Sequence, residues 1–369
     1  MIVKYTRLLL LSGALLFSGC GGDNAFSGTG VIGGGSTENQ GNSLASLHKN
    51  VLQSHADTLV EHLSSLNKQI EAVDANITQT DLSTMQDLFK NIVIEWKSVQ
   101  SSYIAGEDDN ELARVARLFD FFNVGKKLNV ASDIDFALDK NISIGDALYQ
   151  NSSKSITALE YLLFGNSDTI EAITVKINSN KRHKEALGIV VGNLEDKANA
   201  IATFYKNDTK FVSDAKEASN HIVNALIDSS FKLKEQRIGD ASGITVKFKD
   251  RPDPARLEYA KSKLSLVAIR SILITHQEIL GKQSYANFGS FASENGASEV
   301  VKNIEKQLND ALGIVDSFDD VLEEAISKTT VDAKIQKLYD KVKELQRLYF
   351  EALIQALDLT AEIIEADGD

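Results

Sequence analysis

The 369-residue sequence has few of the residues that cross-link or interrupt a chain. It contains one cysteine and only two prolines, Pro252 and Pro254, which lie close together. A single cysteine excludes an intramolecular disulfide framework. Because proline interrupts helices, the long proline-free stretches are compatible with long helices. No run alternates apolar and polar residues between turn residues, so a sheet of any size is not expected.

Common enzyme motifs are missing as well. The chain has no His-Glu-x-x-His stretch, no phosphate-binding glycine loop and no Gly-x-Ser-x-Gly elbow. Acidic residues outnumber basic ones, which gives a formal net charge of −13. A protein of this charge is not expected to bind nucleic acid or anionic lipid.

The first residues are typical of a secreted bacterial lipoprotein. Residues 1–19 carry Lys4 and Arg7, followed by an apolar run from Leu8 to Phe17. This run is shorter than the roughly 20 residues that a membrane-spanning helix needs, so it predicts a cleaved signal peptide. Cys20 follows, and Phe-Ser-Gly-Cys resembles a lipobox. We therefore expect a lipid on Cys20 that attaches the protein to a membrane.

The residues after this cysteine predict a tether and a location. Gly21, rather than aspartate, resembles lipoproteins that are released to the outer membrane. Residues 20–43 are rich in glycine and small polar residues, and they predict a flexible tether with a reach of about 25 to 30 Å. We expect the protein in the bacterial cell envelope, at the outer membrane and facing the periplasm.

The rest of the chain has the spacing of amphipathic helices. One helix is expected from Asp81, as its N-cap, and includes Trp96 as a core residue. Its apolar stripe is Leu82, Met85, Phe89, Ile92, Trp96, Val99 and Tyr103. Long amphipathic helices with short connections bury their stripes by packing antiparallel. We therefore expect an all-α protein of two up-and-down helical bundles, an N-terminal one over residues 44–165 and a C-terminal one over residues 166–369.

Residues 155–165, Ser-Ile-Thr-Ala-Leu-Glu-Tyr-Leu-Leu-Phe-Gly, place one carboxylate on an otherwise apolar helix. Glu160 and Thr157 are three residues apart and project from the same face. Such a carboxylate binds a ligand, pairs with a cation from another helix, or faces solvent.

This segment resembles the signature of the imelysin-like proteins, a family filed as M75 peptidases and linked to bacterial iron uptake. The signature is Gly-x-His-x-x-Glu followed by an aromatic residue, two leucines, an aromatic residue and glycine. Glu160 and the tail after it match, whereas Ser155 replaces the glycine and Thr157 replaces the histidine. Since a threonine hydroxyl is a poor metal ligand compared with imidazole, the change argues against hydrolysis. The resemblance extends to the Trp96 helix, residues 117–129 and residues 366–369. It implies two bundles with a cleft between them.

The signature and a long connection later in the chain together indicate the candidate ligand-binding residues. From the signature these are Ser155, Thr157 and Glu160. Arg237 and Asp240 are added because they begin a long connection, residues 237–254, and ordered loops often line sites. In imelysin-like proteins an extended connection here borders the cleft. A mobile surface loop held by salt bridges is the alternative.

Three histidines, His48, His55 and His62, recur every seven residues on one apolar stripe, so they face protein. Successive members lie roughly 10.5 Å apart along a helix, too far to share one metal ion. A metal site needs one histidine and a residue from another helix, and His55 with Glu160 is the candidate pair, for iron or another divalent metal. The alternative is that the histidines fill a helix seam with hydrogen bonds.

Together these observations predict a lipid-anchored, imelysin-like binding protein of the cell envelope. We expect it to be non-catalytic and to hold iron or an iron carrier during iron uptake. Two alternatives remain. One is a metallopeptidase of the M75 type with a rearranged site, which uses Glu160 as base or ligand and His55 or His62 as the imidazole donor. The other is a helical scaffold that binds another envelope protein.

Overall fold

The computed structural model describes residues 37–73, 76–122, 129–328 and 332–361, with only the backbone for residues 37–41. Within these ranges the chain forms helices and turns without a strand, which confirms the all-α prediction. The described residues belong to one compact unit. The expected signal peptide, Cys20 and residues 366–369 lie outside the described residues.

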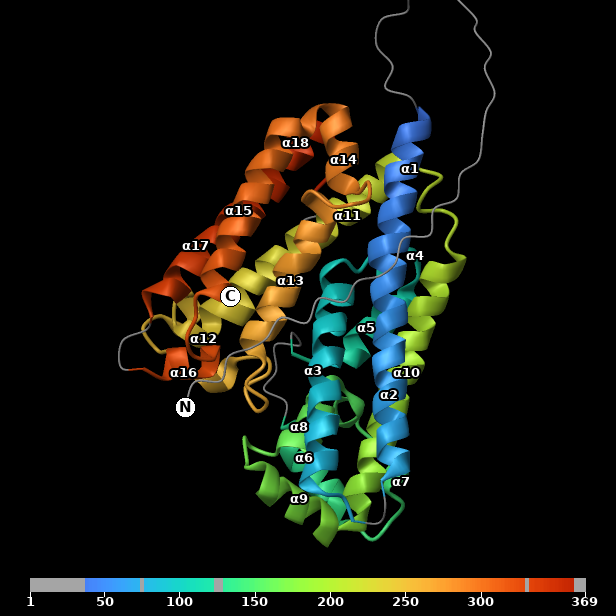
Figure 1. Ribbon diagram of the computed structural model, residues 1–369, viewed down its shortest axis with the longest axis vertical. Coiled ribbons are helices and arrows are strands. Elements are labelled where there is room, and N and C mark those ends of the chain that lie inside the picture. The colour runs from blue at the N-terminus through green and yellow to red at the C-terminus, as the bar shows by residue number, and fades with distance from the viewer. Residues whose placement is uncertain (1–36, 74–75, 123–128, 329–331, 362–369) are drawn as a thin grey trace, which may run out of the picture. The chain divides into compact units, whose positions relative to one another are not determined.

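Three long helical segments, two from the N-terminal part of the chain and one from its middle, pack lengthwise against one another (Figure 1). The first consists of α1 (Thr37–Leu47), the π-helical turn η1 (His48–Gln53) and α2 (Ser54–Ala72). It packs against α3 (Gln79–Ser101) and α10 (Lys181–Asn207). Their apolar stripes form a shared core that includes Leu59, Leu63, Leu66, Phe89, Val190 and Leu194.

Two helix starts differ from the expectation. α1 begins at Thr37, so residues 37–43 are helical rather than part of the tether. The buried Leu44 supports this helix, and extending a nucleated helix is easy. α3 has Thr78 as its N-cap, so the assignment of Asp81 is wrong. Asp81 instead completes a capping box, because its carboxylate accepts a bond from the Thr78 backbone N–H at 2.8 Å.

Short helices connect α3 to α10. They are α4 (Ala105–Asp108), α5 (Asn110–Phe119), α6 (Val130–Asp139), α7 (Ile144–Ala147), η2 (Ser152–Lys154), α8 (Ile156–Phe164) and α9 (Ile170–Ser179). The signature segment forms α8, which packs against α10, α6 and α3. It ends at Gly165, whose φ of 60° lies in the region that favours glycine.

The helices after α10 form a second packed group (Figure 1). They are α11 (Ala215–Lys232), η3 (Leu233–Gly239), α12 (Asp240–Ser242), η4 (Val246–Phe248), η5 (Pro254–Arg256), α13 (Ser265–Leu280), α14 (Phe288–Ala292), η6 (Ser293–Ala297), α15 (Ser298–Asp316), α16 (Leu322–Ser327), α17 (Ala333–Arg347), η7 (Leu348–Leu353) and α18 (Ile354–Leu357). α15 packs between α13 and α17, and α17 also packs against α11. α13 contacts α3 and so joins the two groups, while the division at residue 165 stays a prediction.

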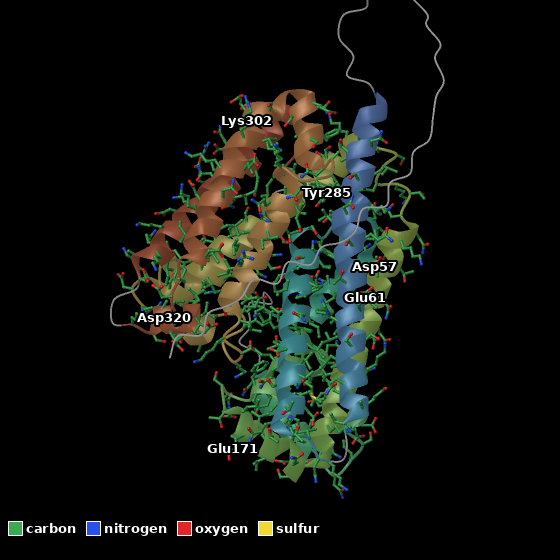
Figure 2. The ribbon with its side chains drawn as sticks, viewed as in Figure 1. Asp57, Glu61, Glu171, Tyr285, Lys302 and Asp320 are labelled. Atoms are coloured by element: carbon green, nitrogen blue, oxygen red, sulfur yellow. The ribbon has the colours of Figure 1, made fainter. Side chains whose placement is uncertain are left out.

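Charged side chains lie on the outer faces of these helices. Figure 2 shows Glu171, Lys302 and Asp320 on the periphery, and all three are exposed or nearly so. Among the helices of the described residues, none combines the length and apolar character needed to cross a membrane.

Candidate functional site

A pocket of about 670 Å³ is lined by residues of α3, α4, α5, α11, η3 and α13. Ala113, Ala116, Ala225 and Ile272 supply apolar wall. Its volume falls in the range of small-molecule sites. The pocket therefore offers an apolar cavity of useful size next to the polar groups described below.

A buried charge cluster adjoins the pocket. Lys97 Nζ lies 2.8 Å from Asp120 Oδ2 and also bonds Glu258 Oε1, and Arg237 Nε donates to Glu258 Oε2 at 2.7 Å. Gln100 Oε1 accepts bonds from Lys97 and Arg237 at 2.7 and 2.9 Å. Two cations thus face two anions, as buried charges require. Asp120, Gln100 and Arg237 line the pocket, so the cluster presents polar groups to it.

The charge states of the cluster follow from these contacts. Burial alone raises the pKa of Asp120, but the charge of Lys97 and hydrogen bonds from Lys97, Trp96 and the Phe122 N–H hold it well below its usual range. Burial lowers the pKa of Arg237, and Glu258 raises it by more. Both side chains are therefore charged at neutral pH.

Trp96 combines a core role with a place at the pocket. Its side chain is fully buried, as expected, and stacks on Phe119 with ring centroids 4.0 Å apart. Its Nε1 donates to Asp120 Oδ2 at 2.9 Å. The tryptophan therefore fixes the position of the Asp120 carboxylate.

Glu160 is buried, with 2% of its surface exposed. Its Oε1 accepts bonds from the backbone N–H of Ser262 at 2.9 Å and from the Ser262 hydroxyl at 2.7 Å. Burial raises the pKa of Glu160 to about 7, although Ser262 and Lys261 oppose the shift. The carboxylate thus holds the segment that leads into α13.

The same segment connects Glu160 to the charge cluster. Glu258, which binds Lys97 and Arg237, lies four residues before Ser262. Between them, the buried Tyr259 ring lies 5.3 Å from Lys97 Nζ. Residues 258–262 therefore contact both the charge cluster and the signature glutamate, although Glu160 does not line the pocket.

The other predicted ligand-binding residues lie in different surroundings. Ser155 is fully buried, and its hydroxyl donates to the Ser152 carbonyl at 2.7 Å. Thr157 is half-buried on α8. Asp240 accepts a bond from the Thr245 hydroxyl at 2.7 Å, and burial raises its pKa.

Of the five predicted ligand-binding residues, only Arg237 lines this pocket. It belongs to the π-helical turn η3, which continues α11, so the connection begins later than the sequence indicated. The turn explains why Arg237 is buried rather than carried on a surface loop. Ligand contacts by Ser155, Thr157, Glu160 and Asp240 stay predictions.

His55 joins α2 to α3 and α13. Its Nδ1 lies 2.8 Å from Glu95 Oε2, and its Nε2 lies 2.8 Å from Glu278 Oε2. Burial lowers the pKa of His55, but the hydrogen bonds with Glu278 and Glu95 outweigh burial and raise it to about 9. The ring is therefore a protonated imidazolium at neutral pH. This agrees with histidines that fill a helix seam.

The metal pair His55 and Glu160 does not fit this arrangement. Both ring nitrogens of His55 contact carboxylates, and Glu160 is bound to Ser262 rather than to His55. In the part of the chain that the structure describes, no three His, Cys, Asp or Glu side chains are placed to hold a metal ion together. Ligation of a metal by His55 and Glu160 stays a prediction, which these contacts do not support.

A second buried polar chain reaches the pocket through Ser229 of α11. Ser229 Oγ lies 2.9 Å from His276 Nε2, and His276 Nδ1 lies 3.2 Å from the Tyr349 hydroxyl. Burial lowers the pKa of His276 to about 3, so its ring is neutral. The chain is thus uncharged at neutral pH.

Several of these residues were missed by the sequence reasoning. Lys97 had a usable signal, since it follows Trp96 and lies four residues after the buried Val93 on one helix. Asp120 and Glu258 lie in connections without periodicity, so no pattern marked them.

Comparisons with known proteins agree with this fold. The family model described as Imelysin (Peptidase M75) matches residues 51–349. The chain is similar to the structure of an imelysin-like protein from Psychrobacter arcticum 273-4, with a TM-score of 0.64 and 17% identity, covering 90% of this chain and 99% of that one. It is also similar to an iron-regulated protein A precursor from Parabacteroides distasonis ATCC 8503, with a TM-score of 0.64 and 12% identity, covering 88% and 96%.

Comparison with curated proteins gives no match. The structural likeness at these identities concerns the fold, and the family model covers most of the sequence. The chain belongs to the imelysin family.

Proposed function

We propose that this protein is a lipid-anchored, non-catalytic binding protein of the bacterial cell envelope that acts in iron acquisition. The observation that carries the proposal is the pocket of about 670 Å³ next to the buried cluster of Lys97, Asp120, Glu258 and Arg237. The cluster holds its polar groups in place before a ligand arrives, which reduces the ordering required on binding.

The contacts at the pocket support binding rather than hydrolysis. A hydrolase needs a general base with a free lone pair near its substrate. Asp120 already accepts bonds from Lys97, Trp96 and the backbone of Phe122. His276 is too weak a base at neutral pH, because burial lowers its pKa to about 3.

The proposal for location and ligand rests on the sequence and the family. The lipoprotein-like first residues support attachment through Cys20 to the outer membrane, facing the periplasm. We include iron in the proposal because a structural relative is named an iron-regulated protein. Of the two expected ligands, iron and an iron carrier, the size and apolar wall of the pocket favour the carrier.

Filling the pocket tests the proposal. Ala116 lines it, and Ala116→Trp would occupy its volume with an indole ring. In a strain that lacks the gene, we expect the parent protein to restore growth under iron limitation and Ala116→Trp to fail. Ala72→Trp, at an exposed position at the end of α2, is the matched control and should restore growth. Growth with Ala116→Trp equal to that with the parent would reject the pocket as the functional site.

The same strain tests the anchor. Cys20→Ala removes the expected lipid acceptor, so the protein should move from the membrane fraction to the soluble fraction. A Cys20→Ala protein that stays in the membrane fraction would contradict lipid anchoring.

A further inference from the structure

The carboxylates that line the pocket already have partners. Asp120 Oδ2 accepts bonds from Trp96 Nε1 and Lys97 Nζ, and its Oδ1 accepts one from the Phe122 N–H at 2.9 Å. Asp228 Oδ2 pairs with Lys232 Nζ at 2.7 Å, and Glu107 also interacts within the protein. The acidic groups therefore leave little capacity to bind a cationic ligand.

The arginines at the pocket retain unused donors. Arg117 is exposed on α5 and makes no hydrogen bond or ion pair within the described ranges. Arg237 uses Nε for Glu258 and Nη2 for Gln100 and Glu258. Its Nη1 has no hydrogen-bond partner among the described residues, and this atom is not fully buried. Since a guanidinium carries five N–H donors, both arginines can bind a further acceptor.

The hydroxyl of Ser229 adds a third donor. Tyr349 is fully buried, and the partner of its hydroxyl is His276 Nδ1. A buried hydroxyl needs an acceptor, so Tyr349 donates to Nδ1, and the neutral ring carries its proton on Nε2. Nε2 then donates to Ser229 Oγ. The Ser229 hydroxyl donates to no carbonyl of α11, so its hydrogen is available to a ligand in the pocket.

We propose that the ligand is an organic anion whose acidic group is bound by Arg117, Arg237 Nη1 and the Ser229 hydroxyl. The inference rests on the proposed function, because it assigns the ligand class of the same pocket. Arg117, Arg237 and Ser229 all line the cavity, and each carries a donor that has no acceptor among the described residues, whereas the carboxylates that line it are engaged. The apolar wall around Ala116 and Ile272 accommodates the body of the ligand.

Two fluorescent probes separate the charge of a ligand from its apolar body. Anilinonaphthalene sulfonate carries an anionic group, and N-phenylnaphthylamine has nearly the same rings without it. Each is titrated into the mature chain from residue 20, in the parent and in Ala116→Trp. Loss of binding in Ala116→Trp assigns the probe to the pocket.

The decisive variants are Arg117→Gln and Arg114→Gln. Both arginines are exposed on α5, but Arg114 does not line the pocket and pairs with Glu111. We expect Arg117→Gln to weaken sulfonate binding about tenfold and to leave the neutral probe unchanged, since a bond between charged groups is lost. Arg114→Gln should change neither affinity. Ser229→Ala should lower the affinity for the sulfonate alone, by less than Arg117→Gln does. That result would support the third contact.

The outcomes distinguish this inference from the proposed function. Both probes could bind in the pocket while Arg117→Gln weakens neither of them, or both equally. The inference that the ligand is an organic anion would then be wrong, and the pocket would remain a binding site. If neither probe binds there, both the ligand class and the proposed pocket function are overturned.

Discussion

At the scale of single residues, the charge of His55 governs how one helix junction responds to pH. Burial lowers its pKa, but Glu278 and Glu95 raise it from 6.5 to about 9 in the folded protein. A raised folded pKa stabilises the fold fully below pH 6.5, and this contribution is lost as pH rises through 9. We expect His55→Gln to lower the free energy of unfolding by about 2 to 3 kcal/mol near pH 6 and by much less near pH 10.

Urea unfolding of parent and variant at both pH values measures this difference. His62→Gln is the matched control, because His62 lies seven residues later on α2 and has no hydrogen bond or ion pair among the described residues. An equal loss for His55→Gln at both pH values would contradict the ion-pair explanation.

The sequence patterns predicted which side chains are buried better than they predicted the hydrogen-bond partners of those side chains. The seven-residue spacing placed His55 on an apolar stripe, and it lies against neighbouring helices as expected. Its two carboxylate partners are 40 and 223 residues away, so no local spacing encodes them. Glu160 shows the same limit. Its place in α8 was predictable, whereas the bond to Ser262, 102 residues later, depends on the packing of two segments.

At the scale of elements, close approach between α13 and α14 depends on a glycine. A Cβ built on Gly289 would lie 2.1 Å from the backbone oxygen of Leu280, which cannot move aside as a side chain can. Gly289→Ala should therefore lower the free energy of unfolding by about 3 kcal/mol. Gly313, in α15, has nothing within 4 Å of a built Cβ, so Gly313→Ala should stabilise the protein by about 0.5 to 1 kcal/mol.

Thermal unfolding of the parent and of both variants measures these two opposite changes in stability. A Gly289→Ala protein as stable as the parent would show that the two helices tolerate separation.

The long helices were predictable because their apolar spacing extends over many turns. The stripe from Leu82 to Val99 matches α3, and the expected all-α fold follows from such stripes along the chain. The ends of the helices were less predictable. A capping box places the N-cap of α3 at Thr78 rather than at Asp81. Caps and turns depend on a few hydrogen bonds, which periodicity does not report.

At the scale of the whole molecule, the buried cluster links parts of the chain that are distant in sequence. Lys97 belongs to α3, Asp120 follows α5, Arg237 belongs to η3, and Glu258 precedes α13. Sequence reasoning found Arg237 because it begins the long connection over residues 237–254, and it missed the other three. Each is an ordinary charged residue until the helix groups pack and bury the four side chains.

This arrangement predicts strong coupling between the members of the cluster. Lys97→Met leaves Asp120 and Glu258 with too little positive charge, so we expect a loss of about 3 to 5 kcal/mol in the free energy of unfolding. Lys97→Met combined with Glu258→Gln again balances the buried charge, since Arg237 then faces Asp120. The double variant should therefore lose less than the sum of the single variants, by about 1 to 3 kcal/mol.

Urea unfolding of the four proteins gives this coupling directly. The exposed pair Lys302 and Glu299 provides a control cycle, in which Lys302→Met and Glu299→Gln should each change stability by less than about 1 kcal/mol. Additive losses in the buried cycle would mean that the four charges act independently. Because Asp120 and Arg237 also line the pocket, coupling would mean that the packing of distant segments determines the polar surface that a ligand meets.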